Sequence, residues 1–181
     1  MSEKPRLQVK YDQEVVPELK SALQLQNVLA LPRLEKVVIN VGAGQTKDPK
    51  RTETAIATLA SITGQKPVVT KARKSISNFK IRQGMGIGVI VTLRGRKMYD
   101  FLDKLIHVSL PRVRDFQGLA PAAFDRQGNY TIAFREHNVF PEISGDAVES
   151  LHGLQVTICT TAQTPAAAAT LLRSLGFPLK T

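Results

Sequence analysis

The segment from Lys71 to Gln83 carries the side chains that a nucleic-acid ligand requires. Its cations alternate with small polar side chains and one aromatic ring. Cations neutralise phosphates, hydroxyl and amide groups hydrogen-bond to phosphate or sugar, and an aromatic ring stacks on a base. The residues of this kind are Lys71, Arg73, Lys74, Ser75, Ser77, Asn78, Phe79, Lys80 and Arg82. They predict contact with RNA or DNA, although Phe79 could instead serve only to anchor the loop.

The positive charge of the chain is concentrated around this segment. The 181 residues carry a net charge of +10, and no Asp or Glu occurs between Thr54 and Tyr99. That window holds Lys66, Lys71, Arg73, Lys74, Lys80, Arg82, Arg94, Arg96 and Lys97. A local excess of one sign indicates a surface for phosphates. The alternative is a solvated basic face without a partner, at a cost in self-repulsion.

Patterns that would indicate an enzyme or a metal protein are weak. Ser75 and Ser77 have no histidine nearby in the sequence, and the single cysteine, Cys159, lies in a predicted strand where we expect it to be buried. The three histidines have no metal-binding spacing, and one cysteine forms neither an intrachain disulfide nor a cysteine cluster. We therefore assign no catalytic residue, no metal site and no cofactor.

Two glycine-rich stretches resemble phosphate-binding turns only in part. Gly42 and Gly44 fit the start of a dinucleotide-binding motif, but Lys47 replaces its third glycine. Glycines 84, 86 and 88 precede a predicted strand, whereas a phosphate-binding loop precedes a helix. We interpret both as structural, the second as a flexible entry of a loop into the sheet.

The N-terminus and the hydropathy predict a protein of the reducing cytosol. Charged residues occupy the first positions, with no apolar stretch behind them that could serve as a signal core. The longest uncharged stretch, 150–172, is too polar to span a bilayer. We expect a soluble, cytoplasmic protein without a membrane partner.

Hydrophobic periodicity predicts strands and helices in mixed order. Alternating apolar residues predict strands over 36–41 and 87–94, and shorter strands are expected at 67–70, 130–135 and 155–161. Helices are expected over 12–25, from Asp48, after Gly95, and from Thr164 to Gly176. This order favours an α+β fold, a mostly antiparallel sheet with helices packed on one face. We expect one domain, 1–181, with a long protruding basic loop at 71–86, since hairpin loops usually have about 2 to 5 residues.

Seven segments occur in the same order as in a known family. They are 32–40 (PRLEKVVIN), 62–67 (ITGQKP), 74–80 (KSISNFK), 91–95 (VTLRG), 110–116 (LPRVRDF), 140–143 (FPEI) and 171–178 (LLRSLGFP). Together they resemble the large-subunit ribosomal protein five family, which binds 5S ribosomal RNA, and its bacterial form most closely. The sequence departs from that family at Gly86, where proline is usual, in 151–155 and at the C-terminal tail.

The resemblance implies a structural, ribosome-bound protein. It implies that the sheet lies on 5S rRNA in the central protuberance, next to large-subunit rRNA and neighbouring large-subunit proteins. It further implies that the loop lies near the peptidyl-site tRNA, and that the protein contacts small-subunit protein thirteen across a subunit bridge. The residues that we assign to 5S rRNA are Asn40, Gln65, Thr92, Lys36, Lys66 and Arg94.

Two alternatives remain open from the sequence. Asn40 and Thr92 could satisfy backbone groups of the protein itself instead of hydrogen-bonding to RNA. The chain could also be a nucleic-acid-modifying enzyme of unknown reaction, although no residue pattern favours this. Arg73, Lys74, Lys80 and Arg82 are expected to contact tRNA phosphates, while the alternative makes the loop a principal anchor for 5S rRNA.

Overall fold

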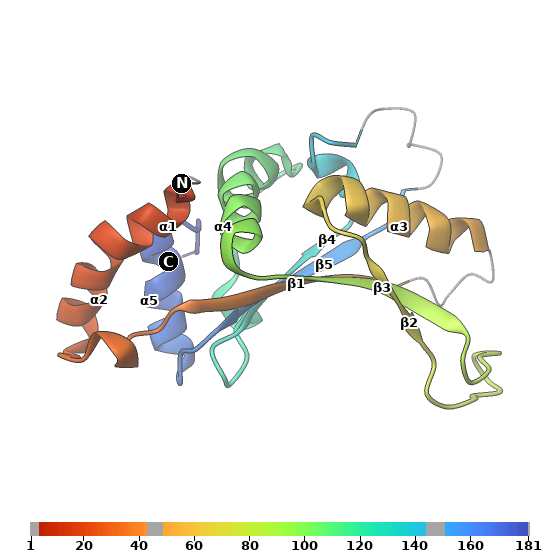
Figure 1. Cartoon of the computed structure of the whole chain (residues 1–181), viewed down its shortest axis with the longest axis horizontal. Helices are drawn as coiled ribbons and strands as arrows, with labels where there is room; N and C mark the ends of the chain where they lie inside the picture. The colour runs from red at the N-terminus through yellow and green to blue at the C-terminus, as the bar shows by residue number, and fades with distance from the viewer. Residues whose placement is uncertain (1–3, 43–48, 144–150, 181) are drawn as a thin grey trace. The chain divides into compact units, whose positions relative to one another are not determined.

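The protein has an α+β fold, seen here in a computed structural model (Figure 1). The structure describes residues 4–42, 49–143 and 151–180. Five strands form one sheet in the order β2-β3-β1-β5-β4. They are β1 (Leu34–Gly42), β2 (Val68–Lys71), β3 (Gly86–Leu93), β4 (Tyr130–Phe134) and β5 (Leu154–Thr160). The sheet is antiparallel, which confirms the predicted fold class.

The first helical run begins earlier than the sequence predicts. A helix was expected over 12–25, whereas α1 (Arg6–Lys10), a π-helical turn η1 (Tyr11–Val15) and α2 (Val16–Leu23) follow one another without a break. Pro17 lies at the junction of η1 and α2, inside this continuous run, and supplies no N–H to the helical hydrogen bonds there. Gln24 ends the run with a left-handed φ of 53°. The prediction missed the first turns because Arg6–Lys10 has only one buried side chain, Leu7.

The other three helices lie where the sequence predicts them. They are α3 (Pro49–Thr63), α4 (Gly95–Lys104), which continues into the π-helical turn η3 (Leu105–Ser109), and α5 (Pro165–Leu175). The predicted cap of α5 is confirmed, because the Thr164 hydroxyl oxygen accepts a hydrogen bond of 3.3 Å from Ala167 N. Gly176 then ends α5 with a φ of 105°.

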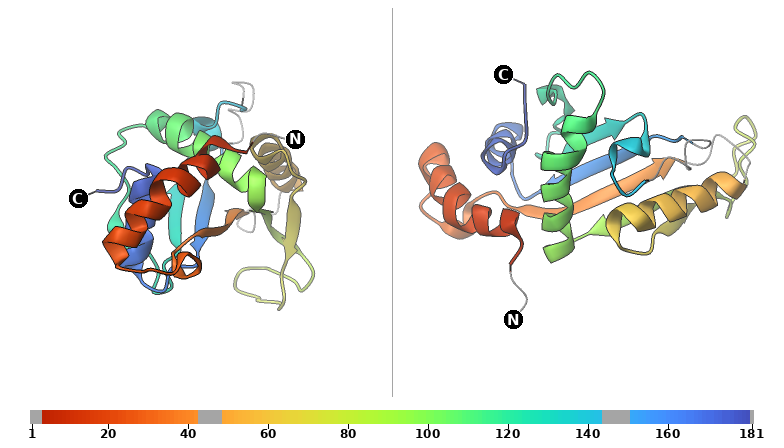
Figure 2. Two further views of the ribbon diagram at one scale, coloured as in Figure 1. Left: turned by 60° about the vertical axis from the view of Figure 1, so that its left-hand side comes forward. Right: turned by 90° about the horizontal axis from the view of Figure 1, so that it is seen from above.

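The chain packs as two compact units that share the strands. Unit 1 comprises residues 1–37, 93–132 and 157–181, and unit 2 comprises residues 38–92 and 133–156. In unit 1, α2 packs beside α5, as both views of Figure 2 show. The side chains of Leu7, Val15 and Leu19 are buried there with those of α5. Unit 1 thus buries the apolar faces of its helices.

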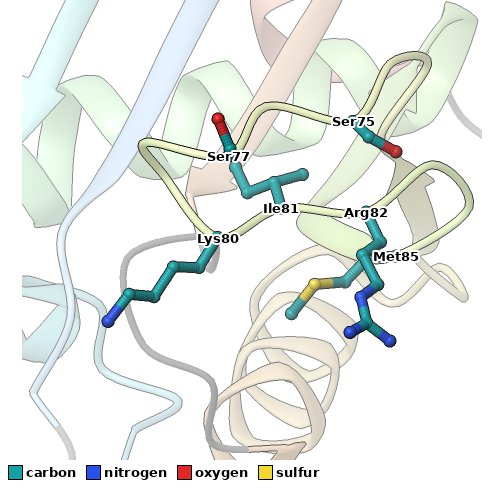
Figure 3. A pocket seen from close by; sticks show the side chains of 6 residues that line it. All are labelled: Ser75, Ser77, Lys80, Ile81, Arg82 and Met85. Atoms are coloured by element: carbon teal, nitrogen blue, oxygen red, sulfur yellow. The ribbon is translucent and has the colours of Figure 1, made fainter.

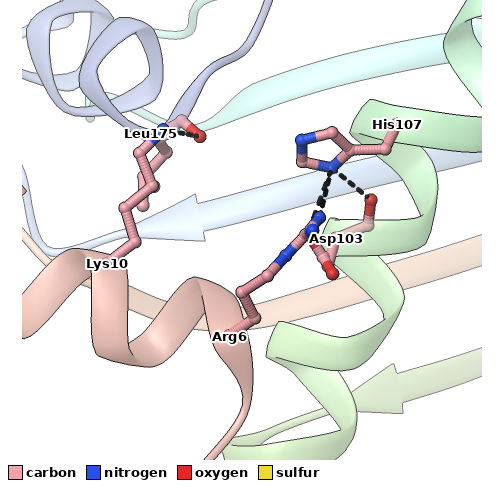
Figure 4. Close-up of polar contacts among 5 residues, drawn as sticks. All are labelled: Arg6, Lys10, Asp103, His107 and Leu175. Carbon is pink, nitrogen blue, oxygen red and sulfur yellow. Dashed lines mark hydrogen bonds and ion pairs between the residues drawn. The ribbon is translucent and has the colours of Figure 1, made fainter.

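Polar contacts connect α1 to two other helices of unit 1 (Figure 4). The Arg6 guanidinium lies 2.8 Å from the Asp103 carboxylate on α4, and 3.3 Å from Nδ1 of His107. Lys10 donates a hydrogen bond of 3.3 Å to the carbonyl oxygen of Leu175, at the end of α5. A cation at a helix C-terminus interacts favourably with the helix dipole. These contacts fix α1 against α4 and α5.

In unit 2, helix α3 covers one face of the strands (Figure 1). Ile39 and Val41 of β1 are buried on this face with Leu59 of α3, as are Val89 and Val91 of β3. On the alternate positions that the sequence pattern predicts, Val38 and Asn40 of β1 and Ile90 and Thr92 of β3 are only half-buried. Unit 2 therefore has a second sheet face that its own helix leaves accessible. No helix in the described part of the chain is long and apolar enough to cross a membrane.

Candidate nucleic-acid interface

Asn40 and Thr92 lie on the accessible face of the unit 2 strands. Both side chains are half-buried, and neither hydrogen-bonds to any residue that the structure describes. The alternative in which they satisfy local backbone groups is therefore not what the structure shows. A half-buried polar side chain without a protein partner exchanges its hydrogen bonds to water for bonds to a ligand. Both side chains are thus available to a ligand.

Gly88 permits a close approach of two strands beside Asn40. A Cβ atom at Gly88 would lie 2.9 Å from Oγ1 of Thr70 and 3.0 Å from the carbonyl oxygen of Val41. It would also lie 3.8 Å from Oδ1 of Asn40. Thr70 faces Gly88 across the antiparallel pair of β2 and β3. Asn40, Thr70 and Gly88 are therefore neighbours in space, and the buried Gly88 fits tightly against Thr70 and Val41.

Replacing Gly88 should consequently destabilise the protein. In Gly88→Ala the new methyl group has too little space against a backbone oxygen, so we expect a loss of about 1 to 3 kcal/mol in unfolding free energy. Urea denaturation measures the loss. The double variant Thr70→Ala/Gly88→Ala removes the contact with Oγ1 but keeps the contact with the carbonyl oxygen of Val41. The double variant should recover part of the lost unfolding free energy. An unchanged urea midpoint for Gly88→Ala would contradict the close fit at Gly88.

Gln65 has a partner within the protein. Its Nε2 donates a hydrogen bond of 3.2 Å to the backbone carbonyl oxygen of Thr92. Residues of β2 are paired with β3 only as far as Ile90, so Gln65 satisfies a carbonyl beyond the end of this pairing. The structure thus brings Gln65 and Thr92 together, as predicted for one site. The bond itself gives Gln65 a structural role that the sequence did not indicate.

The predicted cations of the sheet site are distributed over both units. Lys66 is exposed just after α3 in unit 2. Lys36 on β1 is half-buried, Arg94 after β3 is exposed, and both belong to unit 1. None of the three forms an ion pair with the described residues. Their charges are therefore not neutralised within that part of the protein.

The connection between β2 and β3 is a hydrogen-bonded hairpin. At its base, Ala72 N donates to the carbonyl oxygen of Met85 at 2.8 Å, and Gly84 N donates to that of Ala72 at 2.9 Å. Nearer the tip, Ile76 and Ile81 form an antiparallel bridge through two hydrogen bonds of 2.9 and 3.1 Å. Ser75 Oγ accepts a bond of 2.9 Å from Gln83 N. The backbone of this segment is thus defined by its own bonds.

All nine loop residues that the sequence singles out are exposed. Phe79 at the tip is 70% exposed, so in this structure it does not anchor the hairpin to a core. The cations Lys71, Arg73, Lys74, Lys80 and Arg82 form no ion pair with acidic groups of residues 4–42, 49–143 and 151–180. Five unneutralised charges on one short hairpin produce a strong positive potential. This arrangement suits a polyanion.

An open hollow of about 680 Å³ lies at the hairpin (Figure 3). Its lining combines two hydroxyl groups, two cations and two apolar side chains. The lining residues are Ser75, Ser77, Lys80, Ile81, Arg82 and Met85. In Figure 3 the side chains of Lys80 and Arg82 both extend downward from the hairpin, Lys80 toward the left and Arg82 toward the right.

Chemistry beyond binding finds little support in the side-chain geometry. Cys159 is half-buried, less than the sequence suggests, because it lies on the face of β5 opposite Ile158. Burial nevertheless raises the pKa of its thiol, which keeps it protonated and weakly nucleophilic at neutral pH. Among the described residues, no group of three or more His, Cys, Asp or Glu side chains could hold a metal ion. Gly44 and Lys47 of the partial dinucleotide motif lie outside those residues.

Two features of unit 2 were not found from the sequence. His137 and His152 are buried and stack with their ring centroids 4.1 Å apart, although 15 residues separate them in the chain. Thr70 and Gly88 fit against each other next to Asn40. Both features depend on which segments are neighbours in space, and neither has a local sequence signal. From the sequence we interpret Gly88 as part of a flexible loop entry, whereas a glycine within an alternating strand can also indicate a close backbone approach.

Comparison with known proteins identifies the family. Residues 27–82 match the family "Ribosomal protein L5", and residues 86–179 match "ribosomal L5P family C-terminus". The large ribosomal subunit protein uL5 of Halothermothrix orenii is 54% identical over 93% of this chain and 94% of its own length. That of Natranaerobius thermophilus is 53% identical over 96% of this chain and 97% of its own. That of Mycoplasma mycoides is 49% identical over 98% and 99%.

These matches cover nearly the whole chain, both compact units included. The uL5 relatives are structural ribosomal proteins and not enzymes, so the alternative of a nucleic-acid-modifying enzyme is set aside. The resemblance that the seven segments indicate is confirmed. The chain belongs to the L5 family of ribosomal proteins of the large subunit.

Proposed function

We propose that the protein is a structural constituent of the large ribosomal subunit, in the cytoplasm, and that the accessible sheet face of unit 2 binds 5S rRNA. The observation that carries this proposal is the pair Asn40 and Thr92, two half-buried polar side chains without a partner among the described residues. They lie on strands of a chain that belongs to a ribosomal protein family. Co-sedimentation with large subunits after a high-salt wash tests the assembly, and filter binding to isolated 5S rRNA tests the ligand.

Asn40 supplies the sharpest test of this sheet face. Asn40→Ala should weaken 5S rRNA binding by about 1 to 2 kcal/mol, the scale of a hydrogen bond lost to a charged partner. The fold should survive, because the amide makes no hydrogen bond to the described residues. Titration of labelled 5S rRNA at constant salt measures the change, and a thermal melt monitors folding.

A second asparagine provides the matched control. Asn138 is exposed, and its amide donates a hydrogen bond of 2.8 Å to Glu136 instead of facing a ligand surface. Asn138→Ala should leave 5S rRNA affinity unchanged. Equal affinities for wild type and Asn40→Ala would refute the assignment. So would a loss of affinity that merely follows a lowered melting temperature.

Gln65 should behave differently from Asn40. Its amide is already bonded to Thr92 O, so its contribution to RNA binding is indirect, through the position of β3. It is therefore a positioning residue of the proposed site, together with Thr70 and Gly88. Lys66 supplies a phosphate contact of unit 2, and Lys36 and Arg94 are proposed as phosphate contacts of unit 1, since none of the three is neutralised within the described residues.

The hairpin supports a second contact of the same protein, with the peptidyl-site tRNA. Its five cations are exposed and unneutralised, and its bonds at Ala72 and Met85 hold it independently of the sheet face. Large-subunit rRNA and neighbouring proteins, including small-subunit protein thirteen across the bridge, complete the proposed partners. For these last partners the support is the family membership alone.

A further inference from the structure

We propose that the hollow at the hairpin receives one unstacked nucleotide of the RNA partner, so that the loop prefers RNA with an extruded base over a continuous duplex. This inference rests on the proposed tRNA contact and deepens it. A volume of about 680 Å³ lies within the range of sites for small ligands, roughly 300 to 1,000 Å³. A hollow of this size accommodates a nucleotide but not a double helix.

The lining matches the three parts of a nucleotide. Lys80 and Arg82 offer cations to the phosphate, and Ser77 offers a hydroxyl to phosphate or ribose. Ile81 and Met85 are both half-buried and present apolar surface to the face of a base. Methionine is well suited to this task, because its flexible thioether adapts to flat ring surfaces.

The hairpin is closed by its own hydrogen bonds. The bridge between Ile76 and Ile81, the bond from Gln83 N to Ser75 Oγ and the two bonds of Ala72 fix the backbone around the hollow. Pre-organisation lowers the entropy lost on binding. An open hollow with polar and apolar walls on a hydrogen-bonded hairpin is therefore suited to a ligand that has both kinds of surface.

Lys80 has a backbone conformation that a lysine rarely adopts. Its φ is 54°, in the left-handed region, and its N–H donates a bond of 2.9 Å to Ser77 O. Glycine would occupy this position with less strain. A strained side chain at the rim of a hollow points to a role for that side chain. Lys80→Gly should therefore raise or preserve the melting temperature and yet weaken RNA binding.

Two RNAs test the preference directly. One is a stem-loop with a single bulged nucleotide, and the other is the same stem-loop without the bulge. The full-length protein should bind the bulged RNA roughly tenfold more tightly, as expected for one well-contacted base. Met85→Ala should reduce this ratio to about twofold or less, whereas Met85→Leu should retain most of it. Lys80→Gly should lower the affinity for the bulged RNA.

Val68→Ala provides the matched control, because Val68 is 64% exposed on β2 and does not line the hollow. It should leave the ratio unchanged. Equal affinity of the wild-type protein for both RNAs would overturn the nucleotide site, and so would an unchanged affinity ratio in Met85→Ala. Neither result would contradict the proposed tRNA contact. Failure to bind either RNA by a protein that still binds 5S rRNA would overturn the tRNA contact as well.

Discussion

The affinity for 5S rRNA should fall with salt along a shallow slope. If Lys36, Lys66 and Arg94 supply the phosphate contacts, three cations at roughly 0.7 to 0.9 each give a log–log slope of about −2 to −3. Affinity then decreases about 20- to 60-fold between 50 and 200 mM salt. Titrations of 5S rRNA at four or five salt concentrations measure the slope.

The same measurement discriminates against the alternative in which the hairpin anchors 5S rRNA. With the five hairpin cations included, eight contacts would give a slope of about −6 to −7. The control replaces Arg73, Lys74, Lys80 and Arg82 by glutamine and keeps the hairpin backbone. This variant should show the wild-type slope for 5S rRNA. A slope reduced by three or more would contradict the proposal that the sheet face binds 5S rRNA while the hairpin binds tRNA.

The core of the sheet could be predicted from the sequence because its pattern is local. Apolar residues alternate along β1 and β3, and Val89 and Val91 are buried as that alternation requires. The ends of α5 could also be predicted, because Thr164 before Pro165 is a typical helix start and Gly176 is a typical helix end. Such predictions need only the spacing of apolar residues and the residue types at the helix ends.

Details of the candidate site could not be predicted because they depend on strand register. Gly88 contacts Thr70 only because β2 and β3 pair with that particular offset, and a shift of one residue would send Thr70 to the other face. The bond from Gln65 to Thr92 likewise requires α3 to end beside β3. The sequence assigns Asn40, Gln65 and Thr92 to the same RNA site. Only the structure shows that Gln65 hydrogen-bonds to Thr92 O, whereas the Asn40 side chain has no partner among the described residues.

The hairpin illustrates the same limit. Its length and charge were evident from the sequence, whereas the bridge from Ile76 to Ile81 and the left-handed Lys80 were not. The reason is physical: the tip Ser77–Lys80 has no glycine or proline to indicate its turn type. Ser77 and Asn78 are compatible with several turn types, so the segment is predicted as an irregular loop, although its backbone forms a hairpin.

Replacing residues 73–82 by a short Gly-Ser turn should separate the two proposed RNA contacts. The bonds at the hairpin base, from Ala72 N to Met85 O and from Gly84 N to Ala72 O, lie outside the replaced stretch. The removed residues have exposed or half-buried side chains, so little core is lost. We therefore expect a melting temperature close to wild type and unchanged incorporation into large subunits.

Retention of tRNA at the peptidyl site should fall strongly in ribosomes that carry this variant. Four of the five hairpin cations are absent from this variant. Each phosphate contact contributes roughly 0.7 to 0.9 to the slope of log affinity against log salt, so the slope for tRNA should become shallower by about 3. Near 100 mM salt we expect tRNA to dissociate at least tenfold faster, as a filter-retention time course measures. The glutamine variant of the intact hairpin serves as the control for charge alone and should show much of the same effect. If the turn variant melts normally but fails to bind isolated 5S rRNA, the hairpin is itself a 5S rRNA anchor and the two contacts are not separate.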